Sequence, residues 1–427
     1  MAVVGGGYTG LWTALELRRR EPGLRVVLLE ATRCGEGPSG RNGGFLHGYW
    51  TRLARLRELL GDEGALAVAR AADGVVPAVR GLGGDVWLRE GGYLKVSAAP
   101  AQDAALEKAV AAARALGVEE TALPLSAAEV AERCRSPVFR HGVLFPGATV
   151  QPVRLARALR RAALAAGVEL YEGSRAAAIR PGVVETQGRR LFAREVVVAT
   201  GAWAAGWRPL RRCLTLFGSY AVLTEPIPEQ LEEIGWTGGE AITDGRMFLH
   251  YFRTTADGRV LMGSGSGEIG FGGRVGRRFS HDERAAARAE AGLRRLLPGL
   301  ARARVEHAWG GPIDVSSDHL PFFGTVPGTR IHYGAGYSGS GAGQSWLGGR
   351  ILASLALGAD DEWSRLPLAR RQVQRLPPEP VNFLGGSLVR AALLSVEEAE
   401  EAGRRPPAAA RAVGALPSRL GLRVGTR

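Results

Sequence analysis

The order of apolar and polar positions predicts a strand, a helix and a second strand within the first thirty residues. Ala2–Val4 is a short apolar run, and Leu11–Arg20 repeats its apolar residues at helical spacing. Val26–Leu29 is apolar throughout, which is typical of a parallel strand covered on both faces. The opening therefore predicts the α/β class, with a doubly wound parallel sheet.

Predicted helices and strands continue to follow one another through the first half of the chain. Ser126 stands at the start of one helix and Glu129 follows at capping-box spacing. The predicted helices cover 104–116, 126–134 and 154–166, and the predicted strands cover 168–171 and 196–200.

A second region, from Leu214 to Leu223 onward, is richer in strands. The segments 247–252 and 259–263 flank Ala256-Asp257-Gly258, which is a hairpin signal. A helix follows over 281–297 and ends at Pro298. From about Leu376 the chain is rich in proline and arginine, and we expect a partly mobile surface extension with one helix near 396–403.

Composition narrows the class of protein. The chain has 427 residues, of which 45% are hydrophobic, enough for two or three lobes. A net charge of +13 raises the question of a nucleic-acid partner. We expect none, because arginines are spread along the chain and only Lys95 and Lys108 are lysines.

Other function classes are disfavoured by what the sequence lacks. No apolar run reaches the ~18 residues of a membrane span, and the first strand begins too early to leave room for a signal peptide. The three cysteines form no C-x-x-C pair, and the seven histidines show no metal-ligand spacing. We therefore expect a cytoplasmic protein with no metal site, and a natural start a few residues upstream.

A dinucleotide-binding motif occupies the first turn. Gly5, Gly7 and Gly10 form G-x-G-x-x-G, and Glu30 ends the second strand twenty residues after the last glycine. Such glycines permit a tight turn, close approach to a pyrophosphate and helix–strand packing, while the acid binds a ribose. A glycine-rich turn of another α/β protein is the disfavoured alternative, and the motif alone does not separate FAD from NAD.

Three further segments favour FAD over NAD alone. Each offers backbone N–H groups near a flat ring or a phosphate, at a loop or where a strand ends. The expected cofactor contacts are Ser39, Arg41, Asn42, Gly43 and Gly44 after the second strand, Gly201 after the strand at 196–200, and Gly339, Ser340 and Gly341 before a helix over 345–357.

Over roughly residues 1–365 the sequence resembles the D-amino-acid-oxidase-like superfamily of FAD-dependent amine oxidoreductases. The segments above match in order, as does Trp309-Gly310-Gly311 followed by Asp318-His319-Leu320-Pro321. Ser39-Gly40-Arg41-Asn42-Gly43-Gly44 is most similar to the gamma-glutamylputrescine oxidoreductase-like branch, beside glycine and sarcosine oxidases.

The resemblance implies a Rossmann-type FAD-binding domain of the glutathione-reductase-2 kind, interleaved with an antiparallel-sheet substrate domain. The implied FAD-binding stretches are 1–84, 151–212 and 303–365. The implied substrate stretches are 85–150 and 213–302, and 366–427 is a C-terminal extension.

The chain departs from the family pattern at two points. Members often carry histidine where Ser340 stands, and sarcosine oxidase-like enzymes attach flavin to a cysteine in the C-terminal half. Because no cysteine follows Cys213, we expect non-covalent FAD. Cys34 is an alternative linkage point, although a small buried cysteine is favoured.

The chemistry implied is oxidation of the C–N bond of an amine or amino acid. A hydride passes to flavin N5, the imine hydrolyses, and oxygen or another acceptor takes the electrons. Tyr251 and Arg253 are the candidates for binding a substrate carboxylate, and His47 for facing the flavin. Ordinary structural roles stay open for all three.

Three rival functions stay open at the level of sequence. A 2-hydroxy-acid dehydrogenase would oxidise a C–O bond on the same fold, since fold alone does not decide the chemistry. A non-catalytic FAD-bearing subunit would relay electrons within a complex. Binding of NAD alone is disfavoured by the C-terminal glycine loop.

Overall fold

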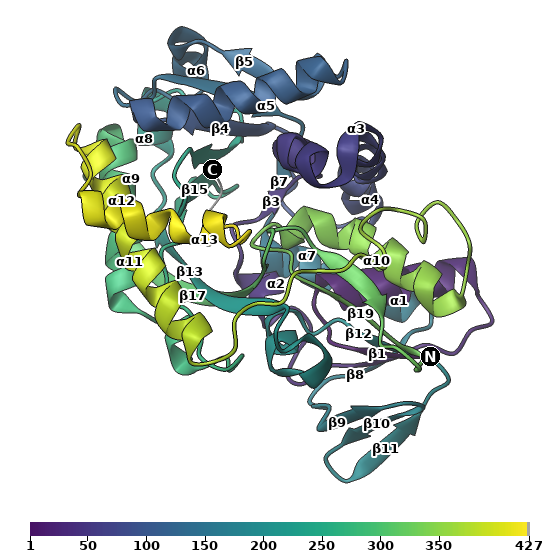
Figure 1. The fold of residues 1–427 in the computed structure, drawn as a ribbon. Coiled ribbons are helices and arrows are strands. Elements are labelled where there is room, and N and C mark those ends of the chain that lie inside the picture. The colour runs from purple at the N-terminus through teal and green to yellow at the C-terminus, as the bar shows by residue number, and fades with distance from the viewer. Residues whose placement is uncertain (425–427) are drawn as a thin grey trace.

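A six-stranded sheet forms one half of the molecule in this computed structural model, which describes residues 1–424 (Figure 1). Five of its strands run parallel and β18 is antiparallel to β19. The order is β18 (Phe322–Thr325), β19 (Ile331–Ala335), β12 (Val196–Val198), β1 (Ala2–Val4), β2 (Val27–Leu29) and β8 (Glu169–Tyr171). This is the doubly wound α/β architecture that the opening residues predict.

Apolar strands at the centre of this sheet are buried on both faces. Every residue of β1, β2 and β12 is buried. Helix α1 (Tyr8–Arg20) lies against α10 (Gly341–Leu357) and α7 (Pro152–Ala165), and their buried faces share one core. The other face of the sheet packs on a smaller sheet of β9 (Ala178–Arg180), β10 (Val183–Thr186) and β11 (Arg189–Phe192).

The other half is built on an eight-stranded sheet. All of its strand pairs are antiparallel except β14 with β4. The order is β17 (Val305–Ser316), β13 (Leu214–Thr224), β16 (Val260–Ser264), β15 (His250–Thr254), β14 (Ala241–Asp244), β4 (Tyr93–Ser97), β6 (His141–Phe145) and β5 (Leu123–Leu125).

One predicted domain boundary needs correction. We assigned 303–365 to the FAD-binding domain, but β17 pairs with β13 along its length, from Ser316 against Leu214 to Val305 against Thr224. The segment Trp309-Gly310-Gly311-Pro312 breaks the alternation of apolar and polar residues that is typical of a strand. The sequence therefore does not predict β17. The chain returns to the six-stranded sheet only at β18.

Local signals elsewhere are confirmed. Strands β15 and β16 form the predicted hairpin, and Ser126 caps α6 (Ala127–Arg133) in a capping box with Glu129. Helix α9 (Glu283–Leu296) ends just before Pro298. Within residues 1–424, no helix combines the length and the apolar character needed to cross a membrane.

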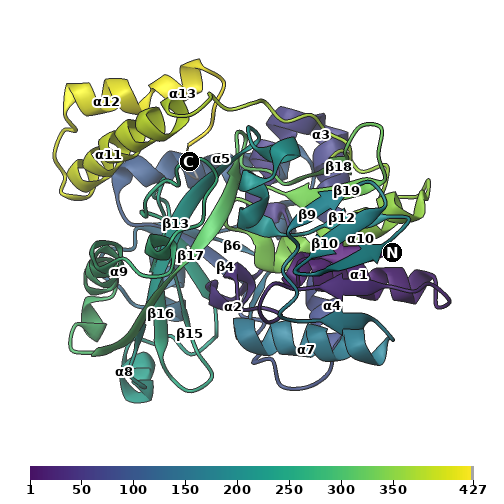
Figure 2. The same ribbon diagram turned by 90° about the horizontal axis from the view of Figure 1, so that it is seen from below.

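The C-terminal extension is more ordered than the sequence suggests. Its main helix, α11, covers Val381–Glu401 and begins well before the predicted start near Val396. The sequence does not predict the first turns of α11, because Gly385-Gly386 and the preceding prolines are typical of loops. Figure 2 shows α11, α12 (Ala408–Gly414) and α13 (Leu416–Arg419) gathered beside β13 and β17, on the side of the molecule away from α1 and α7.

Candidate functional site

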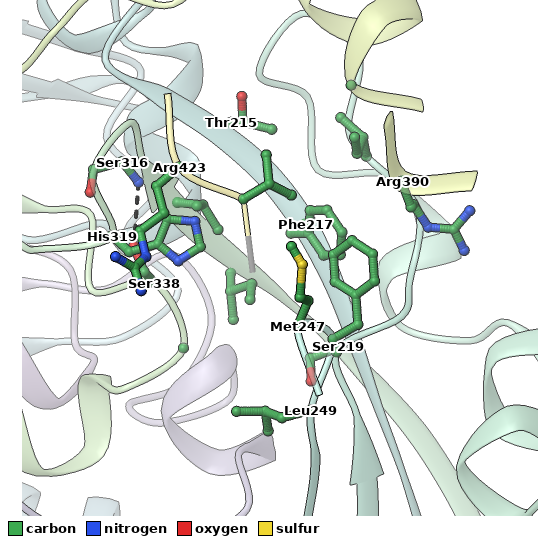
Figure 3. A pocket seen from close by; sticks show the side chains of 18 of the residues that line it. Thr215, Phe217, Ser219, Met247, Leu249, Ser316, His319, Ser338, Arg390 and Arg423 are labelled. Atoms are coloured by element: carbon green, nitrogen blue, oxygen red, sulfur yellow. Dashed lines mark hydrogen bonds between the residues drawn. The ribbon is translucent and has the colours of Figure 1, made fainter. Parts of the chain in front are cut away.

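A cavity of about 430 Å³ lies between loops of the first half and the eight-stranded sheet (Figure 3). Among the predicted cofactor residues, those that line it are Arg41, Asn42, Gly43, Gly339 and Ser340. Both His47 and Tyr251 line it as well. Predicted cofactor and substrate residues that lie far apart in sequence therefore meet at one cavity.

The turn between β1 and α1 lies outside this cavity lining and is closely packed. A Cβ at Gly10 would lie 1.9 Å from the carbonyl oxygen of Gly5, and one at Gly7 would lie 2.9 Å from Ser39 Oγ. Glu30 accepts hydrogen bonds from the N–H groups of Gly6 at 2.7 Å and Thr32 at 2.9 Å. Close approach of backbone thus requires glycine at Gly10, and Gly7 lies against the Ser39 hydroxyl; this close packing is typical of a dinucleotide-binding turn.

The segment after β2 is held in shape by its own side chains. Asn42 donates to the carbonyl of Ser39 at 2.9 Å and accepts from the N–H of Gly44 at 2.8 Å. Ser39 Oγ accepts from the N–H of Tyr8 at 3.0 Å, which ties the loop to the start of α1. Gly44 has a φ of 77°, and a Cβ there would lie 2.1 Å from the carbonyl oxygen of Val150.

The glycine loop before α10 is fixed by two residues that the sequence did not single out. Asp314 on β17 accepts from the N–H of Gly336 at 2.5 Å, and burial raises the pKa of Asp314 to about 6. Arg52 donates to Ser340 Oγ at 2.9 Å and to the carbonyl of His319 at 2.5 Å. Asp314 is buried and Arg52 is partly buried, and only the tertiary structure reveals their role.

Gly201 follows β12 and lies outside the described lining of the cavity. Its φ is 52°, and no other described atom would lie within 4 Å of a Cβ there. The neighbouring Ala199 approaches Gly5, whose Cβ would lie 2.4 Å from its carbonyl oxygen. Gly201 and Gly5 therefore lie at the same edge of the sheet.

Tyr251 and Arg253 share one face of β15 but have different surroundings. Tyr251 Oη lies 2.9 Å from Ser219 Oγ, its ring meets Phe45 edge-on at 5.9 Å, and it lines the cavity. Arg253 is buried beneath the Gly43–Gly44 loop and donates to the carbonyl of Gly43 at 2.5 Å.

The structure does not bring Arg253 to the cavity, so the expected carboxylate fork with Tyr251 is not formed. Arg253 is not among the described residues of the lining. Its guanidinium also donates to the carbonyl of Thr254 at 3.1 Å, and burial lowers its pKa to about 10. Arg253 donates to the backbone carbonyls of Gly43 and Thr254 and is covered by the Gly43–Gly44 loop. These contacts indicate a structural role for Arg253.

His47 is buried beside the cavity and lies against Tyr93. The two ring centroids are 4.8 Å apart, and His47 Nδ1 is 2.9 Å from the carbonyl oxygen of Gly48. Burial lowers the pKa of His47 to about 4. The imidazole is therefore neutral at physiological pH, and it does not add a positive charge to the cavity.

His319 is a lining residue that the sequence analysis assigned only to a family motif. Its φ is 64°, in the left-handed region, which non-glycine residues adopt infrequently, although histidine, asparagine and aspartate do so more often than the others. Figure 3 shows its ring beside Arg423 at one side of the cavity. Burial, with Arg52 and Arg423 nearby, lowers the pKa of His319 to about 3.

The His319→Asn variant should be less sensitive to acid than the natural chain. Between the unfolded pKa near 6.5 and the folded pKa of about 3, the unfolded state binds more protons. Stability therefore falls as pH falls, by about 1.4 kcal/mol per pH unit for this histidine. Urea unfolding at pH 6.5 and 5.0 measures the difference, and parallel losses in both proteins would contradict it.

The residues around the first turn fit the adenine-nucleotide part of FAD. The turn leaves space only for glycine at Gly10, a Cβ at Gly7 would meet the Ser39 hydroxyl, and Glu30 directly follows β2. Within Tyr8–Arg20 the first turn carries no acidic side chain, so the start of α1 is compatible with a pyrophosphate. The first turn of α10, Gly341–Leu357, likewise lacks acids.

Comparison with known proteins agrees with this geometry. The sequence model of the family described as FAD dependent oxidoreductase (DAO) matches residues 1–355. A probable oxidoreductase, OrdL, of Rhizobium meliloti (strain 1021) is 30% identical over 416 residues, covering 92% of this chain and 89% of that protein. Gamma-glutamylputrescine oxidoreductase of Escherichia coli (strain K12) is 29% identical, covering 84% and 83%.

Solved structures show the same fold. Glycine oxidase from Geobacillus kaustophilus superposes with a TM-score of 0.69 at 23% identity, covering 87% of this chain and 98% of that chain. L-proline dehydrogenase from P. horikoshii gives a TM-score of 0.68 at 19% identity, covering 86% and 94%.

Proposed function

This chain belongs to the family of FAD-dependent oxidoreductases, and we propose that it oxidises the C–N bond of an amine or amino acid. The observation that carries the proposal is the continuity of the cavity. It extends from the cofactor loops at Arg41–Gly43 and Gly339–Ser340 to Tyr251 on the substrate-side sheet. Relatives named for glycine and gamma-glutamylputrescine oxidation support the choice of a C–N bond.

FAD would be held without a covalent bond by the glycine turn, Glu30 and the loops on either side of the cavity. When bound, it supplies the hydride-accepting ring for the carbon next to the substrate nitrogen. Asn42 and Ser39 shape one loop, and Arg52 and Asp314 shape the other. The protein thereby holds the two loops at fixed positions before any substrate binds.

The cavity wall would keep the substrate oriented and dry. Phe217, Met247 and Leu249 lie along the sheet side of the cavity, as Figure 3 shows. Tyr251, whose hydroxyl is paired with Ser219, offers a polar edge in this apolar wall. No described lining residue is an aspartate or glutamate, so the described lining offers no carboxylate to pair with an ammonium group, and we propose that the amine reacts in its neutral form.

Reduction of the bound flavin without oxygen tests the proposal. The purified protein should show flavin absorbance, release FAD in acid, and bleach when mixed with one member of a panel of amines and amino acids. Bleaching by 2-hydroxy acids alone would replace C–N with C–O oxidation. A protein that contains no flavin and binds none when FAD is added would refute the proposal.

Activity on an amine is expected to rise with pH. Below the pKa of the substrate amine, kcat/KM should increase about tenfold per pH unit, because only the neutral amine can donate a hydride. His47, with a pKa of about 4, is already neutral in this range and adds no step. Steady-state rates from pH 6 to 10 measure the slope, and a flat profile would favour a hydroxy-acid substrate.

We further propose that oxygen or another acceptor takes the electrons and that the protein works in the cytoplasm. All three cysteines are free thiols, which fits a reducing compartment. Oxygen consumption during turnover, compared with reduction of an artificial dye, separates an oxidase from a dehydrogenase. Cell fractionation tests the location.

A further inference from the structure

A second pocket lies where the C-terminal extension joins the rest of the molecule. Its volume is about 310 Å³, at the lower end of the ~300–1,000 Å³ that small-ligand sites occupy. Its lining comes from the turn Arg208–Leu210, the start of β13, the glycine-rich loop after β16 and the extension from 375 to 382. No described lining residue belongs to the turn after β1 or to the loops at 39–44 and 339–341. This pocket is therefore separate from the expected FAD contacts.

The charge of this pocket is strongly positive. Glu379 is the only acidic residue among its described lining residues, and it accepts from the backbone N–H groups of Gly272 at 3.1 Å and Phe383 at 3.0 Å. Within residues 1–424, no aspartate or glutamate forms an ion pair with any of the lining arginines. These arginines are Arg208, Arg211, Arg212 and Arg375. The pocket thus gathers four positive charges that have no counter-ion on the described part of the protein.

The guanidinium groups also keep most of their hydrogen-bond donors free. Arg212 uses Nε, which donates to the carbonyl of Leu376 at 3.1 Å, and the N–H of Leu376 donates to the carbonyl of Arg212 at 2.7 Å. Among the described residues, the side chains of the other three arginines have no hydrogen-bond partner. All four arginines are exposed, so a ligand reaches them without rearranging the core. Planar forks of donors fit phosphate oxygens, and several forks around one pocket favour an ion with more than one negative charge.

We propose that this pocket binds a small molecule that carries a diphosphate group. Its oxygens bridge Arg208 and Arg211 in the body of the molecule to Arg375 in the extension. The pocket and the larger cavity share part of their walls, because both are lined by Thr215, Leu376, Pro377 and Asn382. The bound ligand thereby fixes the first segment of the extension beside the cavity. This site is additional to the oxidation of a C–N bond and does not depend on it.

Titration of inorganic pyrophosphate into the FAD-bound protein tests the site by calorimetry at constant ionic strength. One pyrophosphate should bind per chain, at least about tenfold more tightly than inorganic phosphate, because the smaller ion reaches fewer guanidinium groups. Flavin absorbance should show that FAD stays bound during the titration. ADP, titrated in the same way, distinguishes a diphosphate ester, which binds more tightly than pyrophosphate, from the free ion. The absence of saturable binding of both pyrophosphate and ADP would overturn the proposal.

A matched pair of double variants separates the pocket from the overall charge of the chain. Arg211→Gln with Arg375→Gln removes two charges from the lining. Arg302→Gln with Arg404→Gln removes the same charge from exposed positions that are not among the described lining residues, one in the body and one in the extension. The first pair should weaken pyrophosphate at least about tenfold, and the second pair by less than about twofold.

Thermal unfolding supplies a second measurement on the same proteins. Without pyrophosphate, both double variants should melt near the temperature of the natural protein, because the substituted side chains are exposed. Pyrophosphate should raise the melting temperature of the natural protein and of the control pair, but not that of Arg211→Gln with Arg375→Gln. Equal weakening by the two pairs would mean that the net charge of the chain attracts the anion, and the assignment to this pocket would be wrong.

Discussion

The Gly10→Ala variant is expected to purify without FAD. A Cβ at this position would lie 1.9 Å from the carbonyl oxygen of Gly5 and 3.1 Å from its carbonyl carbon. Both contacts are backbone atoms of the turn, so relief requires α1 to move away from β1. Overpacking of this kind costs roughly 1–3 kcal/mol or more, and here the cost falls on the turn that we propose binds the pyrophosphate of FAD.

Gly23→Ala is the matched control within the same strand–helix–strand unit. No other described atom would lie within 4 Å of a Cβ at Gly23. The ratio of flavin to protein absorbance should be near that of the natural protein in Gly23→Ala, and near zero in Gly10→Ala. Added FAD should raise the melting temperature of the control only. Full flavin content in Gly10→Ala would show that the turn does not hold the cofactor.

The first turn could be predicted from the sequence because its requirements are local. Gly10 is needed because a Cβ there would meet Gly5, only five residues earlier, and the spacing of Gly5, Gly7 and Gly10 is itself a local pattern. The same holds for the capping box of Ser126 and for the hairpin of β15 and β16, where a few neighbouring residues set the backbone. The family resemblance then located the remaining loops.

The substrate side could not be predicted in the same way. Side chains alternate between the two faces of a strand, so the sequence correctly predicts that Tyr251 and Arg253 share one face of β15. This alternation does not predict which residues cover that face. The Gly43–Gly44 loop covers Arg253, whereas Arg423 reaches the cavity from more than a hundred and fifty residues further along the chain. Such contacts depend on the tertiary structure and leave no periodic signal.

The structure of the C-terminal extension could not be predicted from the sequence for the same reason. Its glycines and prolines predict a loop, whereas α11 forms because Val389 and Leu393 are buried against Phe248, which lies between β14 and β15 of the eight-stranded sheet. Packing therefore overrides weak local propensity over the first turns of that helix. Strand β17 is a parallel case, since pairing with β13 overrides a glycine-rich segment.

A buried ion-pair network attaches α11 to the turn between β14 and β15. Glu397 is 1% exposed, accepts from Arg246 Nε at 3.2 Å, and also accepts from the N–H of Met247. Glu401 lies 3.2 Å from Arg246 and 2.8 Å from Arg295. The carboxylate of Glu397 therefore compensates both a buried guanidinium and a backbone N–H.

The Glu397→Ala variant is expected to lose roughly 1–3 kcal/mol of unfolding free energy, because Arg246 loses one of its two carboxylate partners and the N–H of Met247 loses the acceptor on Glu397. Glu398→Ala, on the exposed face of the same helix, should change stability by less than about 0.5 kcal/mol. Urea unfolding of both variants measures the difference. Since Glu397 lies on α11, Glu397→Ala should also increase cleavage of the extension by trypsin. Equal stability of the two variants would mean that apolar contacts, such as those of Leu393 with Phe248, hold the extension without the network.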